Sequence, residues 1–369
     1  MEFESQPSRT AKARRIGVRR FESVFLAMAT AVLSLGSPAM AQTLAQSLTS
    51  GVVFTADEYS FTISRIDLKS GLVTTVPATI EPHNIQISPD GSLLLAVGLP
   101  PELPEESTDQ SSGGGMAVMD VLGEVVLFDP QHMSAGPVAR IAVGMHPAHV
   151  ITDLAGKRAF VTNSEDDTLS VIDLASRKVI ATVATGDYPH GQRLSPDGRE
   201  IMVANVQSGT VSVIETETLK EIASIPVGIT PVQVGFTPDG SRLYVSLRDA
   251  NQVAVVDVKT RELVATVDVG RSPIQVFATP DGRFVYVANQ GTETDPDNRV
   301  SVIAVATNTV VATIETGRGA HGVVASPDGA TVFVTNILDA TVSAIDVATQ
   351  TVIATISVGQ GPNGITYLP

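Results

Sequence analysis

The chain of 369 residues contains no cysteine, so it has no disulfide bonds and no thiolate metal ligands, and its stability has to come from packing. It also lacks the sequence signatures of several enzyme classes, because no G-x-S-x-G elbow, P-loop or H-E-x-x-H motif occurs. No pair of carboxylates stands out as a general acid and base. The sequence therefore shows no complete catalytic constellation.

Positively charged and aromatic residues are scarce. Lysine and arginine number 24 against 39 aspartates and glutamates, which gives a net charge of −15, and aromatic residues make up only 4%. An acidic surface repels nucleic acid and anionic membranes, and no basic stripe or aromatic stacking platform offsets it. We therefore expect no nucleic-acid partner.

Residues 1–41 have the pattern of a secretory signal peptide. Six basic residues come first, followed by the apolar, uncharged stretch 24–35 and by small residues at Ala39 and Ala41, which form an A-x-A cleavage pattern. Twelve apolar residues are too few for a membrane-spanning helix, which needs ~20. The pattern therefore predicts a signal peptide that is cleaved after Ala41.

Cleavage would leave a mature chain that starts at Gln42, with a short tail over residues 42–50 and no later transmembrane segment. It would remove six basic and three acidic residues, so the net charge of −15 would become −18. We expect a periplasmic or secreted protein. The arginine pairs 14–15 and 19–20 leave the Sec and twin-arginine export routes both open.

A repeat of 42 residues runs through the rest of the chain. Its glycines are spaced by 42, 42, 42, 47 and 42 residues: Gly144, Gly186, Gly228, Gly270, Gly317 and Gly359. The tetrapeptide SPDG or TPDG recurs as a tight turn at 88–91, 195–198, 237–240, 279–282 and 326–329. Each repeat also holds four short runs rich in Val, Ile and Thr, which predict four strands, A to D.

The repeat count predicts how the fold closes. Residues 51–369 accommodate seven units with insertions in the second and sixth, but the first unit lacks strand A, and GPNGITYLP at the C-terminus matches strand A alone. We predict an all-β fold, a seven-bladed β-propeller of four-stranded antiparallel blades, closed by the C-terminal strand A joining N-terminal strands B–D. It forms a single domain over 51–369 with an inserted acidic loop at about 99–123, whose glycines 113–115 indicate a flexible linker.

The segments FVTNSEDDTLSVIDL, VANVQSGTVSVIE and FVTNILDATVSAIDV resemble the YVTN-type β-propeller repeat family, which includes YncE-like periplasmic or secreted propellers. The absence of tryptophan separates the chain from WD40 propellers. The resemblance implies the fold but not one activity, because the family includes surface-layer, binding and enzyme-associated proteins. Related propellers include lactonase-like hydrolases and the copper- or haem-binding domains of periplasmic reductases.

Two further series of polar residues recur with the repeat, and we interpret both as structural. Asparagines end strand B and can bond the backbone of the next turn: Asn163, Asn205, Asn289 and Asn336. Acidic residues end strand C, where an Asx turn leads into strand D: Asp67, Asp129, Asp173, Glu215, Asp257 and Asp346.

Histidine and amide side chains gather at one place in the repeat, one or two positions after its proline. Four of the six histidines lie there: His83, His149, His190 and His321. Amides occupy corresponding places in the other units: Gln233, Gln275 and Asn363. These positions follow the D–A loops, so in a propeller they surround the mouth of the central channel.

We predict a site for a small-molecule or protein ligand on this face. Both insertions are B–C loops, which lie on the same face as the D–A loops, and loops that lengthen on one face suggest that this face is used. Arg271 and Arg318 lie in D–A loops and would add positive charge for an anionic ligand.

Imidazoles that converge near an axis can bind a transition metal such as copper, zinc or iron. We predict His83, His149, His190 and His321 as metal ligands, with the alternative that each histidine only bonds its adjacent turn. Met145 and His146 form a second candidate pair, since thioether and imidazole together suit Cu(I), against the alternative of simple loop packing.

The missing catalytic motifs favour an exported binding or scaffold propeller over an enzyme. Two alternatives stay open. One is a metal- or cofactor-dependent periplasmic enzyme, or enzyme subunit, that uses the clustered histidines. The other is a lactonase-like hydrolase, which rests on analogy of fold alone.

Overall fold

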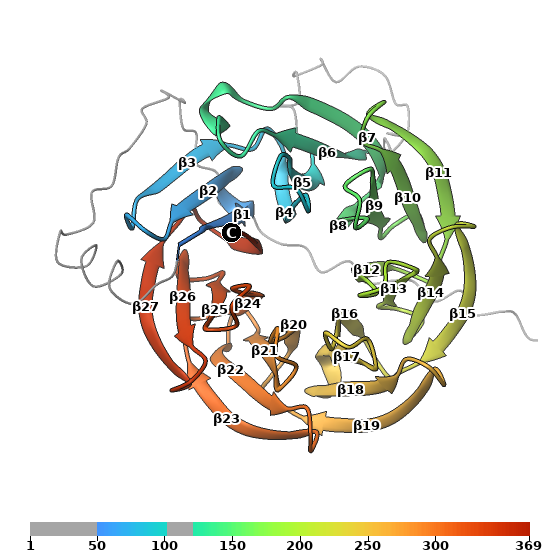
Figure 1. The fold of residues 1–369 in the computed structure, drawn as a ribbon, viewed down its shortest axis with the longest axis vertical. Helices are drawn as coiled ribbons and strands as arrows, with labels where there is room; N and C mark the ends of the chain where they lie inside the picture. Colours follow the sequence, from blue (N-terminus) through green and yellow to red (C-terminus); the bar gives the residue numbers. More distant parts are fainter. Residues whose placement is uncertain (1–49, 102–120) are drawn as a thin grey trace, which may run out of the picture. The chain divides into compact units, whose positions relative to one another are not determined.

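The computed structural model describes residues 50–101 and 121–369. The predicted signal peptide, most of the tail and most of the second-unit insertion lie outside these residues. The described chain forms seven four-stranded antiparallel sheets arranged around a common axis (Figure 1). This confirms the predicted seven-bladed propeller. None of the helices in the described part of the chain has the length and apolar character needed to span a bilayer.

Each blade consists of four strands, named below from the innermost to the outermost. Blade 1 contains β28 (Pro362–Leu368), β1 (Val52–Asp57), β2 (Thr62–Asp67) and β3 (Val73–Pro77). Blade 2 contains β4 (Glu81–Ile87), β5 (Leu94–Leu99), β6 (Leu122–Phe128) and β7 (Ala139–Met145). Blade 3 contains β8 (Pro147–Thr152), β9 (Arg158–Asn163), β10 (Thr168–Asp173) and β11 (Lys178–Ala184).

Blade 4 contains β12 (Pro189–Leu194), β13 (Glu200–Asn205), β14 (Thr210–Glu215) and β15 (Lys220–Pro226). Blade 5 contains β16 (Pro231–Phe236), β17 (Arg242–Leu247), β18 (Gln252–Asp257) and β19 (Glu262–Asp268). Blade 6 contains β20 (Pro273–Ala278), β21 (Phe284–Gly291), β22 (Pro296–Ala304) and β23 (Thr309–Glu315). Blade 7 contains β24 (Ala320–Ala325), β25 (Thr331–Asn336), β26 (Thr341–Asp346) and β27 (Thr351–Ser357).

The two ends of the propeller meet in blade 1, as predicted. Strand β28 pairs with β1 in antiparallel register, with Val53 opposite Tyr367 and Thr55 opposite Ile365. Tyr367 also donates a hydrogen bond from its hydroxyl to the carbonyl of Ser50 at 2.7 Å. Ile365 and Tyr367 are 8% exposed and belong to the core that blade 1 shares with blade 7. The last strand is therefore both a hydrogen-bonded and a packed part of the ring.

Burial follows the position of a strand within its blade. The second and third strands are apolar on both faces and almost wholly buried, because each sheet is stacked between two others. The outermost strands, such as β15, are mostly exposed. The hydrophobic core therefore lies between the blades, and the innermost strands are held firmly around the axis.

The recurring glycine and asparagine form one structural unit, which confirms a structural role for the asparagines, but the bonded backbone group belongs to the preceding D–A loop and not to the next turn as predicted. In blade 7, Asn336 accepts a hydrogen bond from the backbone N–H of Gly317 at 3.0 Å and donates to Thr341 and Ser343 on β26. A Cβ atom on Gly317 would lie only 2.7 Å from Cγ of Asn336. Glycine is therefore required there because the asparagine side chain fills the space.

The turns at the other end of the blades also agree with the sequence. Gly91 has a φ of 71°, which the SPDG turn requires, and Asp90 accepts hydrogen bonds from Ser88 and Ser92. The acidic residues after strand C form Asx turns, as where Asp173 accepts the backbone N–H of Ser176 at 2.7 Å.

Blade 1 has Asp57 at the position where blades 3, 4, 6 and 7 have asparagine and blade 5 has Leu247. The Asp57 side chain is fully buried and accepts hydrogen bonds from Thr55, Thr62 and Ser64. Burial outweighs these bonds and raises the pKa of Asp57 to about 6. A raised carboxyl pKa favours the folded state at low pH, and this contribution is lost as the pH rises toward and past 6.

Replacing Asp57 by asparagine is therefore expected to stabilise the protein at pH 7.5 by about 1–3 kcal/mol, since it removes the ionisation of a buried carboxyl. The gain should shrink to near zero at pH 4, where Asp57 is protonated. Denaturant unfolding at the two pH values measures this. The control is Asp67→Asn, because the pKa of Asp67 is lowered by hydrogen bonds from Ser70 against the effect of burial, so this variant should lose stability at pH 7.5. A destabilised Asp57→Asn variant at pH 7.5 would contradict the account.

Candidate metal centre

The seven histidine and amide positions all lie on innermost strands, one in each blade, which surround the axis in Figure 1. They sit near the ends of these strands that carry the D–A and B–C loops. The residues and their strands are His83 on β4, His149 on β8, His190 on β12, Gln233 on β16, Gln275 on β20, His321 on β24 and Asn363 on β28.

Three of the four predicted histidines come together as one group. His83, His149 and His190 each place a ring nitrogen within 4.8 Å of the other two. Their ring centroids are 5.0 Å apart for His149 and His190, 5.2 Å for His83 and His190, and 6.0 Å for His83 and His149. We call these residues the three-histidine group. They come from three consecutive blades.

An acidic residue from blade 1 fixes the orientation of His83. Glu58, in a 3₁₀ turn (Glu58–Ser60) after β1, has a carboxylate oxygen 3.2 Å from Nδ1 of His83. The amide of Asn363 donates to the other oxygen of Glu58 at 2.7 Å. A carboxylate can only accept hydrogen bonds, so Nδ1 of His83 donates its proton to Glu58, and Nε2 faces the group. The amide nitrogen of Asn363 also lies 3.1 Å from this Nδ1.

His190 is held in the same manner by the backbone. Its Nδ1 lies 3.2 Å from the carbonyl oxygen of Val232, which can only accept, so this nitrogen carries the proton of the neutral ring. Its Nε2 then presents a lone pair, and it lies 3.2 Å from Nε2 of His83. Two lone pairs at this distance repel one another unless a proton or a metal ion lies between them.

The charges of the group follow from this arrangement. Burial raises the pKa of Glu58, but the charge of His83 and the bonds from His83 and Asn363 outweigh it and lower the pKa to about 2. Burial opposes protonation of His83, and the negative charge of Glu58 outweighs it, so the pKa of His83 is raised. Burial and then the charge of His83 hold the pKa of His190 well below its usual value. His83 therefore binds a proton more readily than His190, and its Nε2 faces Nε2 of His190.

His149 completes the group from a buried position. It is 1% exposed, and burial followed by the charges of His190 and His83 holds its pKa well below the usual value. The side-chain amide of Gln233 lies 3.4 Å from its Nδ1. The oxygen of Gln233 accepts the backbone N–H of Val234, so the NH₂ group faces His149. His149 is therefore a neutral ring whose Nδ1 accepts from Gln233 and whose proton is on Nε2, so it acts as a third ligand only when the Gln233 contact or this tautomer changes.

His321 lies outside the three-histidine group, although it is on the same face and 6% exposed. Burial and the charge of His83 lower its pKa to about 4. Its Nδ1, the amide nitrogen of Gln275 and the side-chain oxygen of Asn363 are buried and have no hydrogen-bond partner among the described residues. These three atoms are further polar groups with which a ligand at this mouth of the central channel could form hydrogen bonds.

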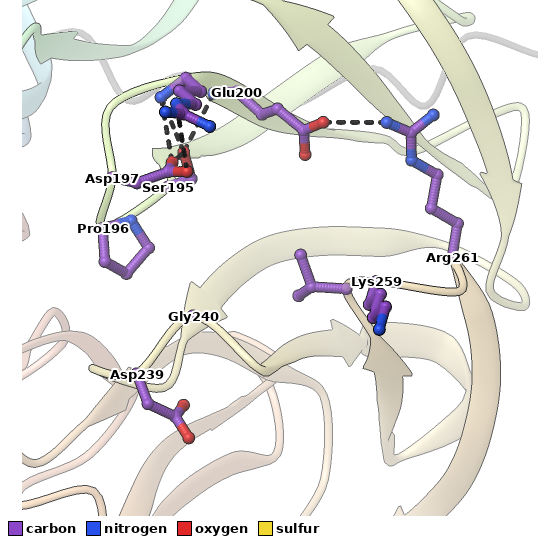
Figure 2. A pocket seen from close by; sticks show the side chains of 10 residues that line it. Ser195, Pro196, Asp197, Glu200, Asp239, Gly240, Lys259 and Arg261 are labelled. Carbon is purple, nitrogen blue, oxygen red and sulfur yellow. Dashed lines mark hydrogen bonds and ion pairs between the residues drawn. The ribbon is translucent and has the colours of Figure 1, made fainter.

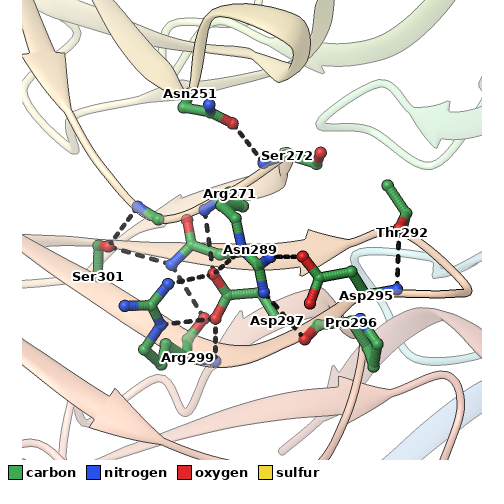
Figure 3. Close-up of polar contacts among 11 residues, drawn as sticks. Asn251, Arg271, Ser272, Asn289, Thr292, Asp295, Pro296, Asp297, Arg299 and Ser301 are labelled. Atoms are coloured by element: carbon green, nitrogen blue, oxygen red, sulfur yellow. Dashed lines mark hydrogen bonds and ion pairs between the residues drawn. The ribbon is translucent and has the colours of Figure 1, made fainter.

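The two predicted arginines form ion pairs with neighbouring acidic residues. Arg271 contacts both Asp295 and Asp297 in the sixth-blade insertion, and Arg299 binds the buried Asp297 from the other side (Figure 3). Arg318 pairs with Asp339 at 2.7 Å. Their charges are thus neutralised locally, and their role in ligand binding remains a prediction.

Met145 and His146 lie at the same end of the blades but do not join the three-histidine group. His146 is exposed, lies 3.8 Å from a carboxylate oxygen of Glu165, and has its ring centroid 6.3 Å from that of Tyr188. Met145 is partly buried at the end of β7.

The opposite ends of the blades carry a polar hollow between blades 4 and 5. It has a volume of about 620 Å³ and is lined by the turns around Asp197 and Asp239, with Arg261 bonded to Glu200 at 2.8 Å (Figure 2). Its acidic groups and Arg261 pair with one another or with the turn backbone. It lies away from the three-histidine group.

Together, the fold and the site define the class of protein as a closed seven-bladed β-propeller with clustered histidines at one end of its axis. The chain belongs to the YNCE-like beta-propeller family, whose profile matches residues 137–241 and 224–368. No curated protein matches the sequence.

Solved structures share the fold at low sequence identity. A protein of unknown function from Desulfotomaculum acetoxidans has a TM-score of 0.70 and 15% identity, with 86% of this chain and 99% of that chain covered. A candidate 6-phosphogluconolactonase from Bacteroides fragilis has a TM-score of 0.68 and 16% identity, with 87% and 98% covered. Hydrazine synthase from Kuenenia stuttgartiensis has a TM-score of 0.62 and 21% identity, with 77% and 88% covered. Identities this low show the fold alone.

Proposed function

We propose that this protein is an exported propeller that binds a transition-metal ion in the three-histidine group. The observation that carries this proposal is the pair of Nε2 atoms of His83 and His190, which face one another at 3.2 Å while both Nδ1 protons are directed elsewhere. Two imidazole nitrogens bound tetrahedrally to one zinc ion lie about 3.3 Å apart. The distance therefore suits a metal ion shared by the two rings.

The partners of the histidines also suit a metal. Ligating histidines usually donate their second N–H to a carboxylate or a backbone carbonyl, which fixes the tautomer and raises the basicity of the ligand. Glu58 supplies such a carboxylate for His83, and Val232 supplies such a carbonyl for His190. A set of neutral imidazoles favours zinc, copper or iron over magnesium and calcium. Three protein ligands would leave a coordination position for water or a ligand.

The export part of the proposal rests on the signal-peptide pattern of residues 1–41.

A second candidate function is the binding of a small molecule or a protein at the same face without a metal. The unpartnered polar atoms of His321, Gln275 and Asn363 support it, because such buried groups are normally satisfied by a bound partner or by water. The lactonase-like and hydrazine-synthase structures add no activity to this chain, since they share its fold alone.

Titration of the metal-free protein with Zn²⁺ and Cu²⁺ tests the proposal. We expect one tight site per chain, and a loss of affinity of at least about 100-fold in His190→Ala and in His83→Gln, because each removes one ligand. His146→Asn is the matched control, since His146 lies at the same end of the blades outside the group, and should bind as the wild type does. Circular dichroism checks that each variant is folded. Equal affinity in folded His190→Ala and wild type would refute the metal site.

Glu58→Gln separates the ligands from the residue that orients them. A glutamine at this position could still accept a hydrogen bond but would carry no charge, so we expect the metal affinity to fall by about 10–100-fold while one metal ion still binds per chain. Calorimetric titration gives both values. An unchanged affinity would show that Glu58 does not support His83.

A further inference from the structure

A second unusual group lies at the other end of the innermost strands. Arg193, on β12, makes no ion pair with any carboxylate of the described residues, and its one hydrogen bond there goes to the carbonyl of Gln192 at 3.1 Å. Arg177 also lacks an ion pair in this part of the chain, but it is exposed and therefore hydrated. Arg193 is only partly exposed.

A partly buried guanidinium without a counter-charge is unfavourable, because the charge loses part of its hydration without compensation. Burial lowers the pKa of Arg193 to about 10, and it remains positively charged at neutral pH. Guanidinium has five N–H donors in a planar fork that suits a carboxylate, and most of them are unused here. The guanidinium of Arg193 therefore has free donors and a positive charge with which to bind an anion.

Two hollows meet at Arg193. One, of about 360 Å³, lies among the ends of β28, β4, β8 and β12. The other, of about 300 Å³, lies among the ends of β12, β16 and β20 and is lined, apart from Arg193, by apolar groups that include Phe236, Phe277, Pro238 and Pro280. The positive group thus stands at the edge of an apolar pocket whose size is at the lower end of those that hold small ligands.

We propose that this end of the propeller binds a small organic carboxylate, with the carboxylate on Arg193 and the apolar part between Phe236 and Phe277. The apolar lining selects against inorganic anions, which would pair with the guanidinium but leave the pocket unfilled. The site is separate from the three-histidine group, which lies toward the opposite ends of the same strands. The two are coupled electrostatically, since the charge of Arg193 contributes to the lowered pKa of His149.

Benzoate is a suitable probe because it combines a carboxylate with a flat apolar ring. We expect calorimetry to detect benzoate binding to the wild type, with weaker binding of acetate and of the neutral analogue benzamide. Arg193→Gln should weaken benzoate binding by at least about 10-fold, whereas Arg193→Lys should retain part of it. Phe277→Ala should weaken benzoate binding and leave acetate binding unchanged.

Arg177→Gln is the matched control and should bind benzoate as the wild type does. His190→Ala should also keep benzoate binding, so failure of this proposal and failure of the metal site can be told apart. Wild-type protein that binds no benzoate at millimolar concentration would overturn the proposal. Equal benzoate affinity in folded Arg193→Gln and wild type would overturn it as well.

Discussion

Deleting residues 360–369 is expected to abolish the cooperative unfolding transition of the native protein or to lower its melting temperature by more than about 10 °C. The deletion removes β28, the innermost strand of blade 1, together with its pairing to β1 and the buried side chains of Ile365 and Tyr367. Truncating a single large core side chain costs about 2–5 kcal/mol. Losing a packed strand should therefore approach the total stability of a typical domain, about 5–15 kcal/mol.

Deletion of residues 103–118, in the second-blade insertion, is the matched control. Shortening a surface connection changes the loop-closure entropy only slightly, by about 0.6 kcal/mol for each twofold change in length. The melting temperature of this variant should stay within a few degrees of the wild-type value, as followed by calorimetry or circular dichroism. If the C-terminal deletion proves to be the milder of the two, ring closure through β28 does not hold the fold together.

As the pH is raised, the metal affinity is expected to increase about tenfold per pH unit until the pH reaches the pKa of His83. Above that pKa the affinity should level off. Below its raised pKa His83 carries a proton that the metal has to displace, and the negative charge of Glu58 strengthens the binding of that proton. His149 and His190 have pKa values well below the usual one, so they are already neutral and release no proton in this range. Calorimetry in buffers of different ionisation enthalpy measures the protons released.

Three ordinary imidazoles would instead release up to about three protons between pH 5 and 6, because each has a pKa near 6.5. A steep dependence of this kind would show that the histidines are solvated and independent. In Glu58→Gln the pKa of His83 should fall, since the charge that raises it is gone. The plateau of the affinity curve should then begin at lower pH.

Most of the fold could be predicted from the sequence because the repeat residues act locally. The proline and glycine of each SPDG turn set the backbone of that turn, and the repeat glycine is required by the asparagine that packs on it. Closure of the ring by the C-terminal strand could be predicted because the first repeat unit lacks strand A. The raised pKa of Asp57 could not be foreseen, because it depends on burial between blades.

The candidate site could be predicted only in part. The in-register histidines pointed to one face, but the sequence did not show that His83, His149 and His190 form a group while His321 stays outside it. Glu58 was missed because it comes from a loop 25 residues before His83. The sequence did offer one signal for Glu58, since it is an acidic residue in a B–C loop on the same face as the histidines. Arg193 was also missed, since only the folded ring shows that no carboxylate in residues 50–101 and 121–369 pairs with it.

The central claim is that a metal ion binds between His83 and His190. Anomalous diffraction at the zinc or copper edge, from crystals grown with the metal, tests it most directly. We expect one strong peak per chain at about 2.0–2.1 Å from Nε2 of both His83 and His190, with a nitrogen of His149 as the third ligand. No peak there, or a peak only at the acidic turns of the opposite face, would contradict it.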